Sequence, residues 1–505
     1  MKGIAHMKNE KKPLIVISTV ILYVLLSGVF LYLTFCNLNN VSIENWDEAR
    51  HGISAYEMLQ NNNFIENTYN YSKDLWNLKP PLSFWAESAS MSIFGYSFFA
   101  FRLPSAICFT AMFLALSVFL HRNYGAVSAI TFMAVFNSFG DLFFEHLGRS
   151  GDADALFNLF FVLSVIFLFY ERKTQKHIYL YLSGFMFSLA FLSKSFHAAS
   201  IMGIIVCFML LSGEFKKLKL KNYIIFFSAS FLPILIWAFA RFLYDGFDFL
   251  GAMFGVDVVE RTEYASQNSF TGFLRMVLSY RIVMLILFIN IASAVLLVVL
   301  KKTDFKNILH SNVLLYALYI IIPSTIYLVT KSAAFWYFFP TFIGLIFTSG
   351  ILYGRLVNSL KGFDGRLKTV LTVSVILVSA VSAVLLVRFM CFNAGLVNSY
   401  SVNAEQSAIR TLLDGKNEYK GKNTYIYKVQ NSYSYKGYEW EQADILTAEL
   451  YCDAHCKNGD IDEFSKDKDS VMFIANEVYE ANKTKTSDFS VIAQNSDYKV
   501  LYNKI

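Results

Sequence analysis

Long apolar runs separated by short polar stretches fill the chain up to residue 390. The first run, residues 14–36, follows four lysines and precedes no small-residue cleavage site. It is also too long for a signal-peptide core, so we expect a retained helix. Because about 20 apolar residues span the hydrocarbon core of a bilayer, the pattern predicts about eleven transmembrane helices. Their expected ranges are 14–36, 101–120, 125–140, 155–170, 178–192, 198–211, 223–244, 282–300, 313–329, 336–353 and 370–390.

The pattern changes near Cys391, and no apolar run long enough to span a bilayer follows it. The tail is polar and rich in Asn, Lys and Tyr. An amphipathic helix is expected over residues 404–413, and alternating residues between turn signals predict short strands. The expected strands are 424–429, 445–451, 471–475, 489–493 and 499–502. The sequence therefore predicts an all-α membrane domain over residues 1–390 and a small α/β domain over residues 391–505.

The distribution of Lys and Arg predicts how the chain crosses the membrane. Only 16% of the 505 residues are charged, against about 25% in soluble domains. The net charge of +6 comes from cations clustered in short loops between spans, which does not indicate nucleic-acid binding. Since Lys and Arg concentrate in cytoplasmic loops, the alternation predicts a cytoplasmic N-terminus. It places the loop around residues 37–100 and the C-terminal domain outside the cytoplasm, in a multi-pass plasma membrane protein of the bacterial inner-membrane type.

An acidic pair, Asp47 and Glu48, follows the first span on the outer side. Ionisable groups close to a bilayer are costly and usually functional. Either carboxylate could serve as a general base or bind a divalent ion. Asp47 could equally be the N-cap of an amphipathic helix, residues 48–60, lying in the membrane interface. Local sequence does not separate these two interpretations.

A second acidic site begins at Arg149 and contains Asp152 and Asp154, again in an outer loop. Either aspartate could cap the following helix. The functional interpretation gains weight because both acidic sites are expected on the same membrane face.

Cations in the outer loops depart from the positive-inside pattern. They are Arg50, Lys79, Arg149, Lys194, Arg261 and Lys331. An anionic lipid head group would explain them, because phosphate binds fixed cations and Arg can hold it with two hydrogen bonds. Snorkelling or solvated loop charge is the alternative. We favour function for Lys79, beside Pro80-Pro81, and for Lys331, close to Tyr337 at a span boundary.

Other chemical motifs are weak or absent. Cys452 and Cys456 have a spacing that superficially suits a metal, but no second ligand pair accompanies them. The chain contains no Walker motif, dinucleotide fingerprint or nucleophile elbow.

The order of these motifs resembles a known family. The first outer loop contains Trp46-Asp47-Glu48-Ala49-Arg50, Lys79-Pro80-Pro81-Leu82 with Trp85, Phe94-Gly95 and Arg102-Leu103-Pro104-Ser105. Residues 149–156, 192–195 and 331–340 supply three later motifs. Together they resemble the aminoarabinose lipid A transferases and the related protein O-mannosyltransferases of the GT-C class. The resemblance implies a polyprenyl-phosphate sugar as donor and covers residues 47–340.

The resemblance also implies roles for single residues. Asp47 matches the family's candidate catalytic carboxylate, and Asp154 matches the acid of the second loop. Lys79 and Arg261 fall where the family contacts the lipid phosphate. Three departures concern the sugar: Leu78 replaces a frequent Glu, His51 a frequent Tyr, and Gln267-Asn268 an expected His.

The sequence thus leads to the hypothesis of an inverting membrane glycosyltransferase acting on a glycolipid or protein of the cell envelope, including lipid A. Asp47, with Glu48 and Asp154, would form the catalytic group, and Lys79, Arg50, Arg261 and Lys331 would bind the donor phosphate. Asp152, Arg149, Lys194, Tyr337 and His51 would line the site. No metal or other cofactor is expected, since fixed cations can stabilise the leaving phosphate. The rival hypothesis is a lipid-linked sugar flippase or other transporter, although no inverted repeat supports it; an enzyme-derived binding protein without activity is a third.

Overall fold

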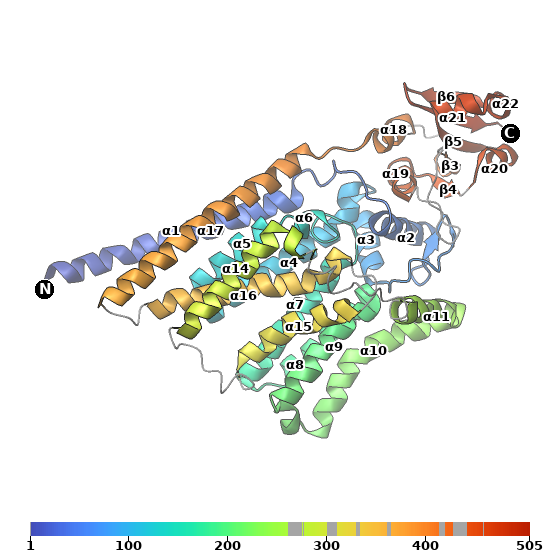
Figure 1. The fold of residues 1–505 in the computed structure, drawn as a ribbon. Helices are drawn as coiled ribbons and strands as arrows, with labels where there is room; N and C mark the ends of the chain where they lie inside the picture. Colours follow the sequence, from blue (N-terminus) through green and yellow to red (C-terminus); the bar gives the residue numbers. More distant parts are fainter. Residues whose placement is uncertain are drawn as a thin grey trace.

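The computed structural model describes residues 2–260, 275, 277–299, 311–329, 334–360, 365–413, 420–427, 442–457 and 459–504. It consists of a bundle of long helices with a small domain containing a sheet at one end (Figure 1). The N-terminus lies at the opposite end of the bundle. The predicted fold class, a helical membrane bundle followed by a small C-terminal domain, is confirmed.

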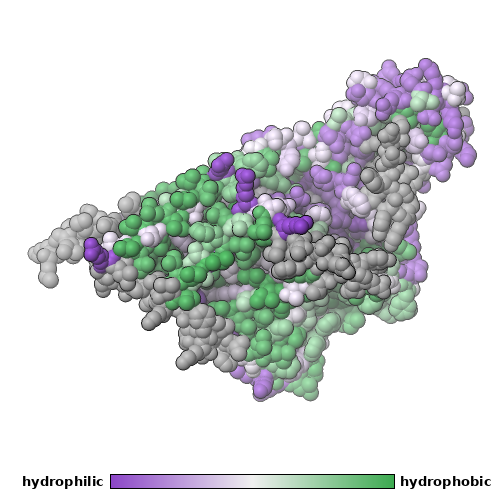
Figure 2. All heavy atoms as spheres, viewed as in Figure 1, coloured by the Kyte–Doolittle hydropathy of each residue, from purple (hydrophilic) through white to green (hydrophobic). Residues whose placement is uncertain are grey.

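The bundle contains helices at each predicted apolar run. They are α1 (Lys2–Phe35), α4 (Phe98–Tyr124), α5 (Ala126–Ser138), α7 (Asp154–Thr174), α8 (Ile178–Lys194), α9 (Ala199–Leu211), α10 (Leu220–Asp245), α14 (Arg281–Val299), α15 (Asn312–Val329), α16 (Phe339–Ser359) and α17 (Gly365–Ser399). Hydrophobic side chains cover the visible face of this bundle, and hydrophilic ones gather over the C-terminal domain (Figure 2).

The predicted number of about eleven spans is not confirmed. Within the described residues, eight segments are long and apolar enough to cross a membrane. The helices over 126–138 and 312–328 are shorter, and α8 and α9 count as one segment, Ile178–Leu211. The last helix, α17, continues to Ser399, past the predicted boundary at residue 390.

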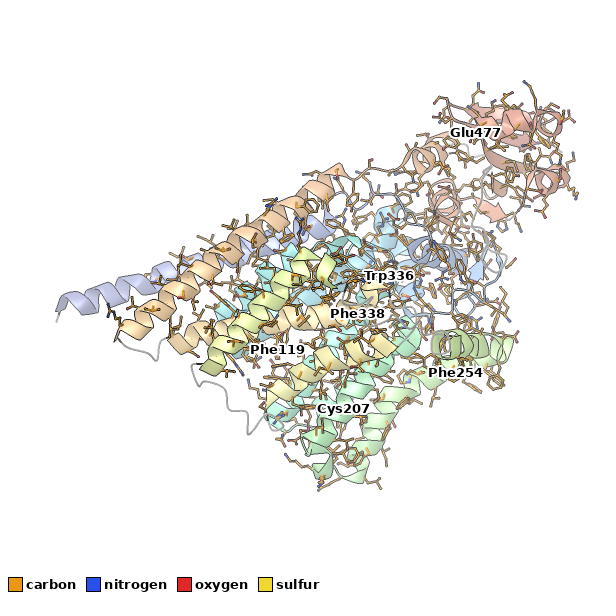
Figure 3. The ribbon with its side chains drawn as sticks, in the orientation of Figure 1. Phe119, Cys207, Phe254, Trp336, Phe338 and Glu477 are labelled. Carbon is orange, nitrogen blue, oxygen red and sulfur yellow. The ribbon has the colours of Figure 1, made fainter. Side chains whose placement is uncertain are left out.

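Aromatic side chains fill the interior of the bundle. Phe30 stacks on Phe113 with ring centroids 4.0 Å apart, and Phe109 and Phe136 pack beside them. Trp336 lies nearer than Phe119 to the end of the bundle that carries the small domain (Figure 3). A close-packed interior of this kind holds the helix ends, and the loops between them, in fixed positions.

The loop after α1, predicted to be the first outer loop, is folded rather than extended. It forms α2 (Asp47–Asn61), the hairpin β1 (Thr68–Tyr69) and β2 (Ser72–Lys73), and α3 (Leu82–Phe94). The helix expected over residues 48–60 is present, and α2 packs between α3 and a helix of the C-terminal domain, so protein covers the face expected to meet lipid. Eleven of the fifteen residues of α2 are buried.

Further short elements follow at the ends of the long helices: α6 (Asp141–Phe144), η1 (Ser195–Ala198), η2 (Glu214–Lys217), α11 (Asp248–Phe254), η3 (Gly255–Glu260) and η5 (Phe335–Phe338).

The C-terminal domain is built on a five-stranded sheet of order β4-β3-β5-β7-β6. β3 runs parallel to β4 and β5, whereas β7 is antiparallel to β5 and β6. Its elements are α18 (Ala404–Leu412), β3 (Asn423–Tyr427), α19 (Gln442–Cys452), β4 (His455–Lys457), α20 (Ile461–Lys466), β5 (Ser470–Ala475), α21 (Asn476–Ala481), α22 (Lys483–Thr486), β6 (Ser490–Gln494) and β7 (Tyr498–Asn503).

Most of the predicted elements of this domain are confirmed, and one is wrong. The helix expected over 404–413 and the strands expected over 424–429, 471–475, 489–493 and 499–502 are present, with ends that differ by about one residue. Residues 428 and 429 of the first strand lie outside the described residues. Residues 445–451, predicted as a strand, belong to helix α19. Short apolar runs do not distinguish a buried strand from a buried helix. Here the run packs its apolar residues against α2.

Candidate functional site

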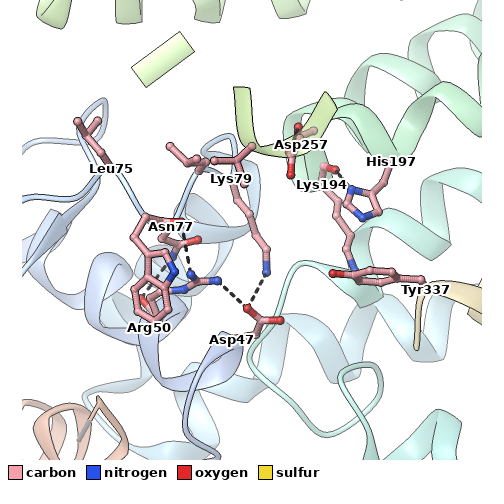
Figure 4. Close-up of a pocket in the computed structure, with 13 residues that line it drawn as sticks. Asp47, Arg50, Leu75, Asn77, Lys79, Lys194, His197, Asp257 and Tyr337 are labelled. Atoms are coloured by element: carbon pink, nitrogen blue, oxygen red, sulfur yellow. Dashed lines mark hydrogen bonds and ion pairs between the residues drawn. The ribbon is translucent and has the colours of Figure 1, made fainter. Parts of the chain in front are cut away.

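A cavity of about 370 Å³ opens where the first outer loop meets the ends of α8 and the segments η3 and η5. In Figure 4, Arg50 and Lys79 point toward Asp47, and Lys194 lies beside Tyr337. The residues that line the cavity are Asp47, Arg50, Leu75, Trp76, Asn77, Leu78, Lys79, Lys194, Ser195, His197, Val256, Asp257 and Tyr337. Five of the predicted site residues, Asp47, Arg50, Lys79, Lys194 and Tyr337, therefore share one cavity although they come from distant parts of the sequence.

Asp47 is the first residue of α2, and its carboxylate faces the cavity. The Arg50 guanidinium donates to Asp47 Oδ1 over 2.6 Å, and Lys79 Nζ lies 4.0 Å from the same oxygen (Figure 4). Burial acts to raise the pKa of Asp47, but Lys79 and Arg50 more than offset it and lower the pKa to about 2. The N-cap position belongs to Trp46, whose side chain makes no capping bond. Asp47 is thus an ionised, partly exposed carboxylate at the start of a helix.

Arg50 is fixed by an aromatic ring as well as by its ion pair. Its guanidinium lies 4.2 Å from the centroid of the Trp76 ring. A planar guanidinium over an indole face is a favourable cation–π contact. Arg50 therefore presents its charge to the cavity in one orientation.

Lys79 joins Asp47 to the second acidic loop. Its Nζ lies 2.8 Å from Asp152 Oδ1, and the other oxygen of Asp152 lies 2.9 Å from His146 Nδ1. Burial would raise the pKa of Asp152, but Lys79 and His146 hold it well below its usual range. Burial lowers and Asp152 raises the pKa of His146, and the net effect is a rise. His146 also stacks on Trp336, with centroids 4.0 Å apart.

Asp47, His146 and Asp152 have ligand atoms within 4.8 Å of one another, a spacing that suits a metal ion. Lys79 Nζ, however, lies within 4.0 Å of both carboxylates. An ammonium group therefore already supplies the positive charge that a metal ion would bring. The donor set fits a divalent ion only if Lys79 moves away.

The other wall of the cavity is formed around Lys194, the last residue of α8. Its Nζ pairs with both oxygens of Asp154, the first residue of α7, and lies 5.3 Å from the centroid of the Tyr337 ring. Asp154 lies behind Lys194 and does not line the cavity. The hydroxyl of Ser195 donates to Asp257 Oδ2 over 2.6 Å.

Asp152 and Asp154 lie outside the cavity lining, and so do three more predicted site residues that are buried in the surrounding structure. Glu48 accepts from Arg102 Nε over 2.6 Å and from Arg102 Nη2 over 2.9 Å. Arg149 Nη1 donates to the carbonyl oxygens of Leu33 and Cys36 at the end of α1, and His51 Nε2 lies 2.7 Å from the Ser83 hydroxyl. Each of the three side chains makes at least one hydrogen bond to another part of the protein, so they hold these loops in place.

Glu48 ties the two acidic loops together. Besides Arg102, it accepts a hydrogen bond from the backbone N–H of Gly151 over 3.0 Å. Gly151 is needed at this point because a Cβ there would collide with the ring of Phe101. Through this contact the loop with Asp152 is set against the start of α2.

Arg261 and Lys331 lie outside the described residues, and their assignment to the donor phosphate stays a prediction. The sequence reasoning missed His146, His197 and Asp257. His146 lies six residues before Asp152 in the same outer loop, and Asp257 is another acid between two spans. Ionisable residues in the outer loops are candidates for function. If this rule is applied to every predicted outer loop, it finds His146 and Asp257.

Part of the chain is similar in sequence to known proteins. Residues 78–242 match the family model of the dolichyl-phosphate-mannose-protein mannosyltransferases. An uncharacterized protein of Aquifex aeolicus (strain VF5) is 27% identical over 205 residues, which are 40% of each chain. An undecaprenyl phosphate-alpha-4-amino-4-deoxy-L-arabinose arabinosyl transferase of Shewanella sediminis (strain HAW-EB3) is 26% identical over 168 residues, 32% of this chain and 29% of the relative. The match thus spans less than half the length of either curated relative.

The fold is similar to that of ArnT from Cupriavidus metallidurans. Its apo structure and its structure bound to undecaprenyl phosphate both superpose with a TM-score of 0.68 at 13% identity. The superposition covers 95% of this chain and 97% of ArnT. The resemblance indicated by the order of motifs is confirmed by the shared fold and by the family match.

Proposed function

We propose that this chain, a GT-C protein of the ArnT and protein mannosyltransferase type, is an integral membrane glycosyltransferase. It takes a sugar from a polyprenyl-phosphate donor and transfers it to a glycolipid or protein of the cell envelope. The alternation of Lys and Arg along the loops supports an extracytoplasmic cavity, with the N-terminus in the cytoplasm. The observation that carries the proposal is the joint presence of Asp47, Arg50 and Lys79 in one cavity.

The three cations of the cavity suit a phosphate leaving group. Lys79, Arg50 and Lys194 enter it from three different elements (Figure 4). As the bond between the anomeric carbon and the phosphate oxygen breaks, negative charge grows on the phosphate. Preorganised cations stabilise that charge more in the transition state than in the ground state. Arg261 and Lys331 would add to this set, as the family resemblance predicts.

Asp47 is proposed to act on the acceptor hydroxyl. The hydroxyl oxygen attacks the anomeric carbon from the face opposite the phosphate, so the configuration inverts. The new C–O bond forms as the bond to phosphate breaks, and the hydroxyl proton passes to Asp47. A carboxylate with a pKa of about 2 is a weak base, because general bases work best near ambient pH. The bound phosphate, however, competes for Lys79 and Arg50 and so raises the pKa of Asp47 in the complex.

Residues behind the cavity are proposed to hold the reacting groups in place. Asp152 and His146 orient Lys79, and Asp154 orients Lys194, through the contacts described above. Tyr337 offers an aromatic face to the sugar. We expect no requirement for a divalent metal, because Lys79 supplies a positive charge between the carboxylates.

The test is an assay with purified full-length protein in lipid nanodiscs. Synthetic undecaprenyl phosphates carrying mannose, glucose or 4-amino-4-deoxyarabinose serve as donors, with envelope lipid and protein extracts as acceptors. Asp47→Asn should abolish transfer, while Asp248→Asn, which alters an exposed outer carboxylate paired with Lys73, should leave it unchanged. Full activity of Asp47→Asn would remove Asp47 from the mechanism.

Two further arms of this assay test the rest of the proposal. Transfer activity should persist in EDTA. If EDTA abolished the activity and Mg²⁺ or Mn²⁺ restored it, the protein would require a metal. Movement of the lipid-linked sugar across proteoliposomes without transfer would support the flippase hypothesis instead.

A further inference from the structure

The segment just before Asp47 is bonded to the C-terminal domain, although some 360 residues separate the two in sequence. The side-chain amide of Gln406, in α18, accepts from Ile43 N over 2.9 Å and donates to Ile43 O over 3.0 Å. Ala443 N, at the start of α19, donates to Asn45 Oδ1 over 3.0 Å. We refer to these three hydrogen bonds as the 43–45 clamp.

The part of the clamp that joins Gln406 to Ile43 is buried. Gln406 is 1% exposed and Ile43 is 3% exposed. Ile43 belongs to a single hydrophobic cluster that also contains Ile53 of α2, Phe101 of α4, and Leu446 and Phe473 of the C-terminal domain. The C-terminal domain and the loop that carries Asp47 therefore share one core, and a shift of the domain would move the loop.

The same segment is held from the membrane side by Arg102. Its guanidinium donates to Val41 O and Ser42 O, each over 2.8 Å. Ser42 Oγ in turn accepts from Asn403 N over 2.8 Å. The backbone before Asp47 is thus fixed between Arg102 on one side and the C-terminal domain on the other.

Trp46 lies between the clamp and Asp47 in an unfavourable backbone conformation. Its φ of 75° and ψ of −117° fall in a region that a non-glycine residue rarely adopts. Such a conformation costs about 1–3 kcal/mol and persists only where the surrounding structure imposes it. If the clamp were released, Trp46 could relax, and the first residue of α2 would turn away from Lys79 and Arg50.

We propose that the C-terminal domain contributes to catalysis, because the 43–45 clamp between this domain and the loop positions Asp47. Gln406 and Asn45 are the side chains that form the clamp. Both are positioning residues that act through Asp47 and do not touch substrate. The proposal rests on the proposed function of Asp47. It assigns a role in catalysis to a domain that lies outside the cavity.

The test compares Gln406→Met and Asn45→Ala with wild type in the full-length protein. Met has the shape of Gln but neither donates to nor accepts from the Ile43 backbone. Asn45 is exposed, so Asn45→Ala should fold even if the buried change does not. Both variants should lower kcat by about tenfold or more, the change that a loss of 1.4 kcal/mol in transition-state stabilisation produces. The donor KM and the affinity for undecaprenyl phosphate alone should stay within about twofold, because Lys79, Arg50 and Lys194 remain.

The pH profile gives a readout that loss of stability does not change. Asp47 needs Lys79 and Arg50 nearby to stay ionised, so its displacement should move the acid limb of the kcat profile to higher pH. The control is Asn503→Leu. Asn503 is buried in β7 and donates to the carbonyl oxygens of Phe464 and Asp467 within the C-terminal domain. This variant should lower the melting temperature and leave the acid limb in place.

The outcomes separate this proposal from the proposed function. No transfer by wild-type protein would overturn the proposed function and, with it, this proposal. A second outcome would overturn the role of the clamp alone. In that case Asp47→Asn is inactive, but Gln406→Met and Asn45→Ala keep the kcat and the pH profile of wild type. A third outcome is that Gln406→Met and Asn45→Ala match Asn503→Leu in kcat and in the position of the acid limb. This would show that Gln406 and Asn45 have only a structural role, and it would also overturn the proposal.

Discussion

Helix α2 carries a carboxylate near each end, Asp47 at its first residue and Glu57 toward its last turn. Asp47 faces two cations across the cavity, and its pKa falls to about 2. Glu57 is fully buried against the C-terminal domain. Its Oε1 accepts from Tyr71 N over 3.0 Å, and its Oε2 has no hydrogen-bond partner. Burial raises the pKa of Glu57 to about 8, although its hydrogen bonds act in the opposite direction.

Glu57 has a counterpart in Glu449 of α19, on the other side of the same interface. Glu449 is also fully buried, and neither of its carboxyl oxygens has a hydrogen-bond partner. Burial first, and then the charge of Glu57, raises the pKa of Glu449 well above its usual value. Within the described ranges, no Lys or Arg forms an ion pair with either glutamate. One helix thus holds a carboxylate that stays charged and another that is neutral, and the difference lies in whether cations are near.

Among substitutions of the cations near Asp47, the largest loss of transfer activity should come from removing Lys79, which keeps Asp47 charged. Lys79→Met leaves both Asp47 and Asp152 without their shared ammonium. We expect kcat/KM for transfer to fall by about 10²–10³-fold, the loss seen when one preorganised electrostatic group is removed. The acid limb of the pH profile should also move upward, because the pKa of Asp47 rises once Lys79 no longer lowers it. Steady-state kinetics between pH 4 and 9 would measure both.

Lys73→Met is the matched control for this prediction. Lys73 belongs to the loop predicted to lie outside the cytoplasm and is paired with Asp248 over 2.8 Å, away from the cavity lining. Exposed pairs contribute little, so its kinetics should equal those of wild type. Equal losses in the two variants would mean that general surface charge, rather than the contact with Asp47 and Asp152, explains the effect.

Much of the architecture could be predicted from the sequence because hydrophobicity sets it locally. Each apolar run in the membrane domain became a helix, and four of the five expected strands are present. The exception, residues 445–451, is an apolar run whose partner is α2, almost 400 residues earlier. Its helical form follows from burial against that partner, which the local pattern does not contain.

Part of the candidate site could also be predicted, because residue type and predicted membrane side are properties of the local sequence. Residue type and membrane side identified Asp47, Lys79 and Lys194 as candidates. They did not show that Glu48 is bonded to Arg102 and Gly151 or that Asp154 is paired with Lys194. Nor did they point to Gln406 and Asn45. Whether a carboxylate is reactive, structural or neutral depends on its neighbours in space.

The second effect concerns stability at the Glu57 end of α2. An unfolded Glu has its ordinary pKa of 4.5, whereas that of folded Glu57 is about 8. Between these values the folded state keeps a proton that the unfolded state loses, so stability falls as pH rises through this window. The slope is at most about 1.4 kcal/mol per pH unit for one such group. From pH 6 to pH 8, Glu57 should therefore contribute a loss of about 2 kcal/mol in stability, seen as a fall in melting temperature.

Glu57→Gln should remove the share of that pH dependence that comes from Glu57, because the amide is neutral throughout, whereas buried Glu449 keeps its own share. Glu477→Gln, on the exposed face of α21 (Figure 3), should keep the wild-type dependence. The measurement is thermal unfolding of the full-length variants in detergent at pH 6, 7 and 8. Parallel curves for wild type and Glu57→Gln would mean that Glu57 is not buried as a neutral acid, and the contrast with Asp47 would be lost.

The smallest effect should come from changing the shape of a cation at the Asp47 end without changing its charge. Arg50→Lys keeps a positive charge beside Asp47 but loses the planar contact with Trp76, whose ring centroid lies 4.2 Å away. A cation–π contact at a partly exposed site contributes about 1 kcal/mol, so kcat/KM should fall by roughly fivefold. The acid limb should stay where it is in wild type, because Asp47 still has two cations nearby. Arg50→Met should add an upward shift of that limb. If Arg50→Lys moved the limb as far as Arg50→Met, the orientation of the guanidinium, and not its charge alone, would be what keeps Asp47 ionised.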